Sequence, residues 1–364
     1  MDGIGWFTYE TVKRMSQNHP EHEFVLIFDR KIPEKFQFSS NVSLKTLSPQ
    51  ARIPILWTTW FQFSLPRFLK KIKADLFISP EGWIPLNLDI PTLVVIHDLN
   101  FEHHPENIIP SHRNHLLKYF PKYAEKASRI ATVSEFSQQD ISECYNVPLE
   151  KIDVVYNGVG DKFKPLSREE IKLVQQRISD GSPYFLFVGT LHPRKNLENL
   201  FKAFEIFKKE NKSSYKLVVA GNKKWWPKKL DRLYQQLNCR NDIIFTGRLS
   251  EEELAEVMAS AAALTYVPHF EGFGIPLLEA MKSEVPIITS NTSSMPEVAG
   301  EAAVYCDPFD VQSIAGAMDQ LVSSHTLGID LVRIGRERVF KFSWDKTAEL
   351  LWRSVEKTME KNVT

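Results

Sequence analysis

The sequence predicts an α/β protein made of two doubly wound domains, each a parallel sheet covered by helices on both faces. Short apolar runs of strand length alternate with amphipathic runs of helix length throughout the 364 residues. Several apolar runs, such as residues 91–96 and 261–267, contain no regular polar alternation. Strands that are buried on both faces have this composition, and the chain is long enough for two ordinary domains.

The first domain is expected to contain a helix at residues 6–16 and a series of short strands. The strands are expected at residues 24–28, 41–47, 75–79, 91–96, 129–133 and 152–156. Gly3 and Gly5 indicate a glycine loop ahead of the first helix, and a doubly wound domain normally has a strand before such a loop. We therefore expect this domain to lack its first strand in this chain, unless the two glycines belong only to an irregular terminus.

Residues 51–74 combine aromatic and basic side chains and contain no acidic residue. The side chains in question are Trp57, Trp60, Phe61, Phe63, Phe68, Arg52, Arg67, Lys70, Lys71 and Lys73. An amphipathic surface of this composition can meet anionic lipid. A core-packing helix with a solvated basic end explains the same pattern, and Pro66 interrupts any single helix. Both interpretations stay open.

Polar residues directly follow two of the predicted strands. His97 and Asp98 come after residues 91–96, and Ser134 comes after residues 129–133. Open α/β sheets bind ligands at the carboxyl ends of their strands, so these three residues are candidates for a binding site. A strand-end histidine can also close a loop, and Ser134 can simply cap the following helix.

The second domain is expected to begin after a hinge at residues 157–160. Its strands are expected at residues 184–188, 215–221, 242–249, 261–267 and 285–289, and helices at 310–321 and 328–340, with a final helix of the chain at 344–360. After the first of these strands, Arg194 and Lys195 precede a helix that starts at Asn196. Two cations at a helix N-terminus are repelled by its dipole unless an anion joins them, which favours a bound diphosphate.

The stretch that organises the chain is residues 268–281, which follow a predicted buried strand. Gly272 and Gly274 allow backbone N–H groups to approach a ligand closely, and Pro276 suits the first turn of a helix. A strand, a glycine turn and a helix N-terminus together form an anion site.

Two carboxylates flank that glycine turn: Glu271 comes just before it and Glu279 lies in the predicted helix after it. Carboxylates beside an anion site do not suit the phosphate itself, but they suit hydroxyl groups such as those of a sugar ring and a ribose. Two glutamates at this spacing alone would be explained by an ordinary strand–loop–helix. The glycines and the proline between them favour a binding site.

Composition and charge exclude several classes of protein. The 45 basic residues balance 45 acidic residues, whereas a dedicated nucleic-acid binder usually has a basic excess.

The cysteines and the clustered histidines are Cys144, Cys239, Cys306, His103, His104, His112 and His115. Their spacing predicts neither a disulfide framework nor a metal site. No apolar run approaches the roughly 20 residues of a membrane span, and no leader is recognisable at the start, so a soluble or peripheral protein is expected.

Residues 271–280 resemble the donor-site signature of the retaining glycosyltransferases of family 4, which have the GT-B fold of two Rossmann-like domains. The resemblance covers nearly the whole chain and is strongest over residues 185–307. It implies an acceptor-binding domain at 1–163, a nucleotide-sugar-binding domain at 164–343 and a last helix at 344–364 that crosses back to the first domain. The active site would be the cleft between the domains. The reaction would need no metal and no cofactor, since the nucleotide-sugar is a substrate.

The same resemblance implies a role for each candidate residue. Glu271 would contact the donor hexose, and Glu279 would hold the ribose hydroxyls. Lys195 and Arg194 would hold the diphosphate, although the family's arginine often directly follows the glycine of this loop, so that Arg194 would act as its substitute. His97 would face the donor sugar. The other substrate-binding candidates are Gly3, Gly5, Asp98, Ser134, Gly272, Phe273, Gly274, Ile275, Gly247 and Arg248.

The resemblance thus implies transfer of a hexose from a GDP- or UDP-sugar to a glycan or lipid-linked glycan, with retention of configuration. Enzymes of envelope polysaccharide and lipopolysaccharide synthesis that resemble mannosyltransferases fit loosely. Such an enzyme would act in the cytoplasm, or peripherally on anionic lipid at the inner face of the cytoplasmic membrane. Two alternatives keep the fold: a nucleotide-sugar epimerase, and a non-catalytic nucleotide-sugar-binding partner. A dehydrogenase is disfavoured, because no Gly-x-Gly-x-x-Gly run follows a predicted strand.

Overall fold

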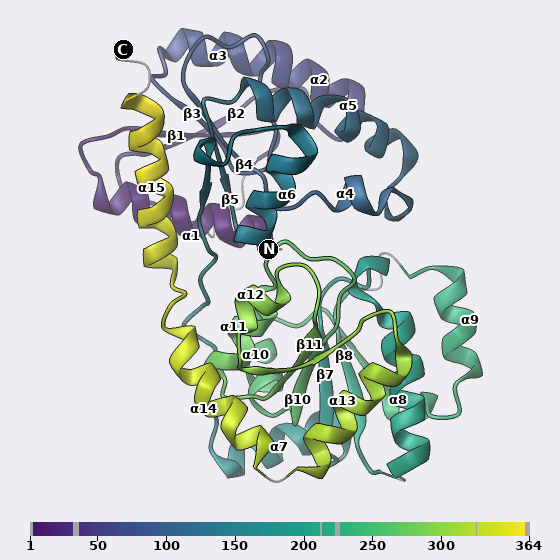
Figure 1. Ribbon diagram of the computed structural model, residues 1–364. Helices are drawn as coiled ribbons and strands as arrows, with labels where there is room; N and C mark the ends of the chain where they lie inside the picture. Colours follow the sequence, from purple (N-terminus) through teal and green to yellow (C-terminus); the bar gives the residue numbers. More distant parts are fainter. Residues whose placement is uncertain (1–2, 32–35, 212, 223–225, 325, 361–364) are drawn as a thin grey trace. The chain divides into compact units, whose positions relative to one another are not determined.

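The computed structural model describes residues 3–31, 36–211, 213–222, 226–324 and 326–360. The chain divides into two compact units (Figure 1). Unit 1 comprises Met1–Gly158 together with Trp344–Thr364, and unit 2 comprises Val159–Ser343. The division after Gly158 falls inside the predicted hinge at residues 157–160.

In its described residues, unit 1 contains parallel strands that form two sheets. The strands are β1 (Phe24–Phe28), β2 (Val42–Thr46), β3 (Phe77–Ser79), β4 (Thr92–Val95), β5 (Arg129–Thr132) and β6 (Ile152–Val154). β1 pairs with β2, and the other four strands form a sheet in the order β3-β4-β5-β6. β4 and β5 are buried throughout, whereas every residue of β1 is only partly buried. The six strand positions predicted for this domain are confirmed, but the expected single sheet is divided.

The last helix of the chain belongs to unit 1. The helices of this unit are α1 (Gly3–Asn18), α2 (Pro54–Thr59), α3 (Leu65–Ile72), α4 (Asn100–His103), α5 (Pro110–Lys126), α6 (Glu135–Tyr145) and α15 (Trp344–Glu360). α15 lies beside α1 (Figure 1), and Arg14 Nε donates to the Asp345 carboxylate at 2.7 Å. Thr347 Oγ1 donates to the Tyr156 carbonyl at 2.7 Å. α15 therefore closes the unit that the first part of the chain begins.

The segment from α2 to α3 is a helix with an irregular centre. A π-helical turn at Trp60–Ser64 joins the two, and the Leu65 N–H bonds to the Trp60 carbonyl five residues earlier. Pro66 then stands at the second position of α3, where, having no N–H, it makes no hydrogen bond to the preceding turn of this continuous helical segment. The π-turn therefore joins α2 to α3 without ending the helix. The interruption predicted at Pro66 is present as this local irregularity, and the helix is not broken.

Unit 2 contains one parallel sheet in its described residues. Its strands are β7 (Tyr184–Val188), β8 (Lys216–Ala220), β9 (Ile243–Gly247), β10 (Ala263–Tyr266), β11 (Ile287–Ser290) and β12 (Ala303–Cys306). The strand order is β12-β11-β10-β7-β8-β9. The chain therefore builds one half of the sheet outward from β7 and the other half outward from β10. This is a doubly wound sheet, and its order reverses at the β7–β10 pair.

Helices cover both faces of this sheet. They are α7 (Arg168–Ser179), α8 (Leu197–Asn211), α9 (Lys228–Gln236), α10 (Glu251–Ala259), α11 (Ile275–Lys282), α12 (Met295–Ala299), α13 (Val311–Ser323) and α14 (Leu327–Val339). α8 and α13 pack together on one face, and α10, α11 and α14 lie on the other (Figure 1). The core under α8 is rich in phenylalanine, with Phe185, Phe201 and Phe207 fully buried. The predicted α/β class with two parallel-sheet units is confirmed, while β12 and α7 were not singled out from the sequence.

Candidate active site

The loops after β7 and β10 lie next to each other, because these strands are neighbours in the sheet. Open α/β sheets bind ligands beside such a reversal of strand order, at the carboxyl ends of the strands. The loop after β7 carries Arg194 and Lys195, and the loop after β10 carries Glu271. The two loops are joined directly, since the His269 N–H donates to the Arg194 carbonyl at 2.9 Å. The sheet topology therefore brings together residues that lie more than 70 positions apart in the chain.

Two glycines, Gly189 and Gly221, allow the backbones at the ends of β7 and β8 to lie in close contact. Gly189 has a φ of 139°, and a Cβ on Gly221 would lie 1.8 Å from the Gly189 carbonyl oxygen. The Gly189 N–H also bonds to the Ala220 carbonyl. The ends of β7 and β8 thus approach as closely as the backbone permits, and a side chain on Gly221 would push the loop away.

The turn before α11 is held in one conformation. Gly274 is the N-cap of α11 with a φ of 89°, a left-handed conformation that favours glycine, and a Cβ there would lie 2.6 Å from a side-chain carbon of α12. Ser293 Oγ accepts the Glu271 N–H at 3.2 Å, and Ser294 Oγ donates to the Glu271 carbonyl at 2.8 Å. The loop after β11 therefore fixes the backbone of Glu271 from both sides.

Four side chains form a charged network beside that turn. The Glu271 carboxylate accepts from Arg194 Nη1 at 2.6 Å and from Tyr266 Oη at 2.9 Å. Lys195 Nζ also contacts the Glu271 carboxylate and the Tyr266 hydroxyl. The side chains of Lys195 and Glu271 are each 12% exposed, and that of Arg194 is 23% exposed. Charges with so little water between them interact more strongly than they would at the surface.

Glu271 is ionised throughout the physiological range of pH. Burial alone would raise the pKa of its carboxyl group, but the positive charges of Arg194 and Lys195 outweigh burial and lower the pKa to about 2. Burial and the Glu271 carboxylate raise the pKa of Tyr266 well above its usual value, so that this side chain stays a neutral hydrogen-bond donor. Two positive charges and one negative charge leave the network with an excess positive charge.

Glu271 is the anion that joins the two cations in the structure. From the sequence, Arg194 and Lys195 were expected to need a diphosphate, because they precede a helix. They lie in a 3₁₀ turn, Pro193–Lys195, just ahead of α8, and both contact the Glu271 carboxylate. Their position alone therefore does not require a bound phosphate, and the case for one rests on the remaining positive charge and the adjacent start of α11.

Glu279 lies in α11 and differs from Glu271 in its ionisation. Desolvation raises the pKa of Glu279 to about 8, with a smaller contribution from the negative charge of Glu251. The carboxyl group is therefore largely protonated at neutral pH. A protonated carboxyl group can donate one hydrogen bond and accept another, which matches a pair of adjacent hydroxyl groups.

The raised pKa of Glu279 predicts that the stability of unit 2 falls as the pH rises. Between about 4.3, the pKa of an unfolded glutamate, and about 8, the folded chain holds a proton that the unfolded chain has lost. The free energy of unfolding should then fall by up to about 1.4 kcal/mol per pH unit. Glu279→Gln should remove this dependence, so that chemical denaturation at pH 5 and pH 8 shows the variant gaining stability relative to the wild type.

The matched control is Glu256→Gln, which changes a half-exposed glutamate paired with Arg177 at 2.6 Å in the same unit. This control should keep the pH dependence of the wild type. Parallel pH profiles for the wild type and Glu279→Gln would show that Glu279 ionises in the usual range.

The remaining predicted residues of unit 2 lie at the carboxyl ends of strands or in the turn. Gly247 ends β9 with a φ of 72°, and Arg248 follows it as an exposed side chain. Gly272 is buried, and Ile275 is the first residue of α11. Phe273 is buried and its ring packs edge-on against Phe342 at a centroid distance of 5.9 Å. Its ring is therefore part of the core, and only its backbone belongs to the turn.

In unit 1, His97 and Ser134 lie at the ends of the neighbouring strands β4 and β5, as predicted. His97 Nε2 lies 2.9 Å from the Pro80 carbonyl oxygen, and its ring packs edge-on against Phe7. Asp98 Oδ1 accepts the Asn100 N–H at 3.0 Å, at the start of α4. The Ser134 hydroxyl accepts the Ser137 N–H at 3.0 Å and caps α6. The Asp98 contact closes the turn ahead of α4, and the capping alternative left open for Ser134 is what the structure contains.

The glycine loop predicted around Gly3 and Gly5 is wrong. α1 already begins at Gly3, so both glycines lie in its first turn. The first turn of α1 contains both glycines and has no helical periodicity of apolar residues. For that reason the sequence there resembled a loop. Their predicted part in substrate binding stays a prediction.

Sequence reasoning missed Tyr266 and assigned no contact to Ser293 or Ser294. Tyr266 is the last residue of a buried strand and was counted as part of the apolar run. Its position at the strand's carboxyl end, five residues before Glu271, was the signal that could have identified it. The two serines follow the next strand, β11, at the same edge of the sheet.

Two family models match this chain, one on each unit. The model described as Glycosyltransferase Family 4 matches residues 1–163, and the one described as Glycosyl transferases group 1 matches residues 168–338. The O-antigen chain mannosyltransferase B of Escherichia coli is 27% identical over 361 residues, which are 95% of this chain and 93% of that protein.

Solved structures share the fold at low sequence identity. Sucrose-phosphate synthase from Thermosynechococcus elongatus is 17% identical, with a TM-score of 0.82 over 99% of this chain and 94% of its own. HepE from Anabaena, solved in complex with UDP-glucose, is 14% identical, with a TM-score of 0.77 over 98% and 96% of the two chains. The fold, the family models and the named relatives define an enzyme of the glycosyltransferase class with the GT-B fold. The chain therefore contains a Glycosyltransferase Family 4 domain followed by a Glycosyl transferases group 1 domain.

Proposed function

We propose that the chain transfers a hexose from a nucleotide-sugar to a glycan or lipid-linked glycan, with retention of configuration and without a metal. The observation that carries this proposal is the network of Arg194, Lys195, Glu271 and Tyr266 at the reversal of strand order in unit 2. It combines an excess of positive charge with a carboxylate, next to the N-terminus of α11. A ligand with a diphosphate and a hydroxyl-bearing sugar matches both features.

The diphosphate is proposed to bind Arg194, Lys195 and the backbone N–H groups at residues 272–275. The first N–H groups of a helix have no partner within the helix, and the helix dipole adds a partial positive charge. When the bond between the sugar and the diphosphate breaks, its electron pair goes to the leaving phosphate. Positive groups that are already in place stabilise that charge without having to move, which is usually the dominant contribution to such a reaction.

The two glutamates are proposed to bind hydroxyl groups of the donor. Glu271 would accept from a hydroxyl of the hexose, in exchange for one of its contacts with Arg194 or Lys195. Glu279 would hold the two ribose hydroxyls, for which a protonated carboxyl group has both a donor and an acceptor. Gly247 and Arg248, at the end of β9, are proposed to lie beside the base.

Retention is proposed to proceed by attack from the face that the diphosphate leaves. A covalent intermediate would need a free carboxylate as nucleophile, and Glu271 is a poor one because three donors hold it and its pKa is about 2. The acceptor hydroxyl would then lose its proton to the leaving phosphate. His97 and Asp98 in unit 1, together with Gly3 and Gly5, are proposed to contact the sugars, His97 as the donor-sugar contact, whereas the buried Ser134 caps α6.

The relatives guide the choice of sugar and base. The O-antigen chain mannosyltransferase B of E. coli supports mannose, and HepE was solved with UDP-glucose. The test is to incubate the chain with GDP-mannose and UDP-glucose, with and without a lipid-linked glycan, and to follow release of the nucleoside diphosphate. An acceptor-dependent release with the new linkage in the donor's anomeric configuration is expected. A free epimer without acceptor would identify an epimerase, and binding without turnover would identify a non-catalytic partner.

A second proposal concerns the surface of α2 and α3, which we propose contacts anionic lipid at the inner face of the cytoplasmic membrane. Trp60 is buried and Phe61 packs against the core, so the core-packing alternative holds for part of the segment. Other apolar side chains are exposed, namely Ile53 at 50%, Ile55 at 69% and Phe63 at 52%. The residues Lys70, Lys71 and Lys73 are also exposed. No helix in the described part of the chain is long and apolar enough to span a bilayer.

We predict that the double variant Ile55→Glu and Phe63→Glu binds anionic vesicles at least about tenfold more weakly than the wild type, because burial of each side chain contributes about 1.5–3 kcal/mol. Co-sedimentation with phosphatidylglycerol-containing vesicles measures this. The control changes two apolar residues of unit 2 that are at least as exposed, Leu173→Glu and Ile329→Glu, and should bind like the wild type. Equal binding by both double variants, or equal binding to uncharged vesicles, would remove the proposal.

A further inference from the structure

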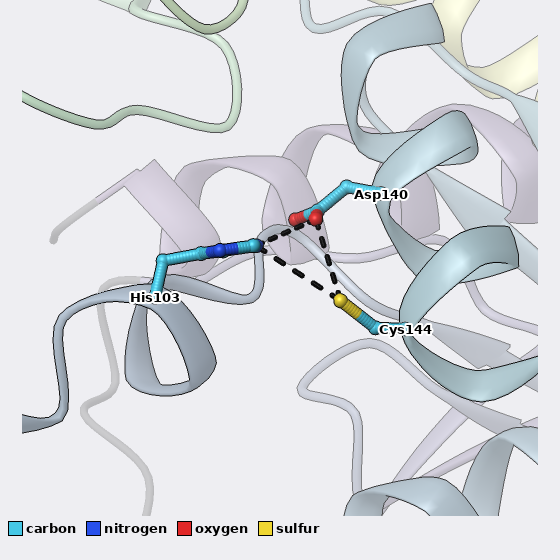
Figure 2. Close-up of side chains that lie close together, drawn as sticks. All are labelled: His103, Asp140 and Cys144. Atoms are coloured by element: carbon cyan, nitrogen blue, oxygen red, sulfur yellow. Dashed lines mark hydrogen bonds and ion pairs between the residues drawn. The ribbon is translucent and has the colours of Figure 1, made fainter.

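Three potential metal ligands lie together in unit 1, on α4 and α6. They are His103, Asp140 and Cys144, and their ligand atoms all lie within 4.8 Å of one another (Figure 2). His103 Nε2 lies 2.6 Å from Asp140 Oδ1 and 4.0 Å from Cys144 Sγ, and Cys144 Sγ lies 3.6 Å from the same carboxylate oxygen. The three side chains point toward one common position.

The local fold explains why they meet. Asp140 and Cys144 are four residues apart on α6, so their side chains lie on one face of that helix, one turn apart. His103 is the last residue of the short helix α4. The two helices are tied beside the cluster, because Tyr145 Oη donates to the Glu102 carboxylate at 2.8 Å. The cluster is therefore held by secondary structure on both sides.

A second observation points independently to a ligand. The Asp140 side chain is only 10% exposed, and its Oδ2 atom is buried without a hydrogen-bond partner in the described part of the chain. A buried carboxylate oxygen without a partner is unfavourable. A cation at this carboxylate would satisfy it.

The set of donors selects the kind of cation. An imidazole, a thiolate and a carboxylate are the ligands of zinc, whereas magnesium and calcium prefer oxygen alone. Zinc bonds of about 2.0–2.3 Å in a tetrahedron place the ligand atoms roughly 3.3–3.6 Å apart. The observed separations of 2.6, 3.6 and 4.0 Å lie on both sides of that range. Small rotations of His103 and Cys144 would therefore bring the three atoms to tetrahedral positions.

We propose that unit 1 binds one zinc ion through His103 Nε2, the Asp140 carboxylate and Cys144 Sγ, with a water molecule as the fourth ligand. On binding, the thiol of Cys144 loses its proton to solvent and the sulfur bonds to zinc, while His103 binds through its neutral nitrogen. Such an ion would link α4 to α6 and stabilise unit 1 against unfolding. None of its three protein ligands is among the residues assigned to the proposed sugar transfer.

The first test is cobalt titration of the metal-free full chain. Cobalt should bind at one equivalent and give a thiolate charge-transfer band in the near ultraviolet, which zinc then abolishes by displacement. Cys144→Ser should lose that band, and both Cys144→Ser and His103→Gln should weaken binding by at least about a hundredfold, more than the loss of an outer-shell partner does. The matched control is His104→Gln, which changes the neighbouring histidine, half-buried beside Glu106, and should bind like the wild type.

A second measurement needs no variant. The three cysteines of the chain are free, and Cys144 is exposed whereas Cys239 and Cys306 are buried. Labelling of the native protein with a thiol reagent therefore reports on Cys144, and one equivalent of zinc should slow it at least tenfold, while magnesium should not. Absence of the charge-transfer band together with unchanged labelling in zinc would overturn the proposal. Either result leaves the proposed sugar transfer untouched.

Discussion

Lys195→Met is expected to lower the turnover number by about 10²–10³, which is typical for loss of one preorganised group that stabilises transition-state charge. Methionine keeps most of the volume of the lysine side chain, so the change removes mainly the positive charge. Arg194 would still balance Glu271, but the network would lose the excess positive charge proposed for the diphosphate. Affinity for the free nucleoside diphosphate should fall as well. Steady-state kinetics with the accepted donor and calorimetry with the diphosphate measure the two effects.

The control for this prediction is Lys202→Met. Lys202 lies on α8 of the same unit and pairs with Glu198 at 2.9 Å, so it undergoes the same chemical change outside the network. This variant should keep the wild-type turnover. If Lys195→Met also keeps it, Lys195 has no role in the reaction and its contact with Glu271 is structural.

Glu271→Gln is expected to separate binding from turnover. A diphosphate bound as proposed would compete with the Glu271 carboxylate for Arg194 and Lys195, which both contact that carboxylate. Removal of the negative charge leaves both cations to the diphosphate, so affinity for the free nucleoside diphosphate should rise by about tenfold, the order expected of one hydrogen bond to a charged group. Turnover should nevertheless fall by about 10²–10³, because the amide is a weaker acceptor for the donor hexose.

A suitable control is Glu284→Gln, which removes the carboxylate partner of Arg336 at 2.6 Å, beyond the far end of α11. It should change neither quantity. A Glu271→Gln variant that binds the diphosphate more weakly would show that the carboxylate supports that pocket instead of competing with it. Tighter binding with full turnover would mean that Glu271 does not touch the reacting sugar.

The strands of unit 2 and the glycine turn before α11 could be predicted because their signals are local. A five-residue apolar run such as β7 indicates a buried strand by itself, and Gly274 with Pro276 marks a turn and a helix start within three residues. The family resemblance then supplied roles for Glu271 and Glu279. The direct pairing of Arg194 with Glu271 could not be predicted, because it depends on β7 and β10 being neighbours in the sheet.

Other features escaped prediction for similar reasons. One of the four residues of β12 is partly exposed, so its run was not recognised as a buried strand. The division of the unit 1 sheets depends on which strands pair, and that is not encoded in any single run. His103 and Asp140 are 37 residues apart, and a search for metal ligands at regular spacing could not join them.

The central claim is that unit 2 binds a nucleotide-sugar at the network around Glu271 and the start of α11. The most direct measurement is isothermal titration of the wild type with GDP-mannose, UDP-glucose, GDP and UDP, alongside Glu279→Ala and the control Glu256→Ala. The account predicts binding to one nucleotide class at one site per chain, weakened at least tenfold in Glu279→Ala and unchanged in the control. Binding of equal strength in all three proteins, or binding to neither nucleotide class, would contradict it.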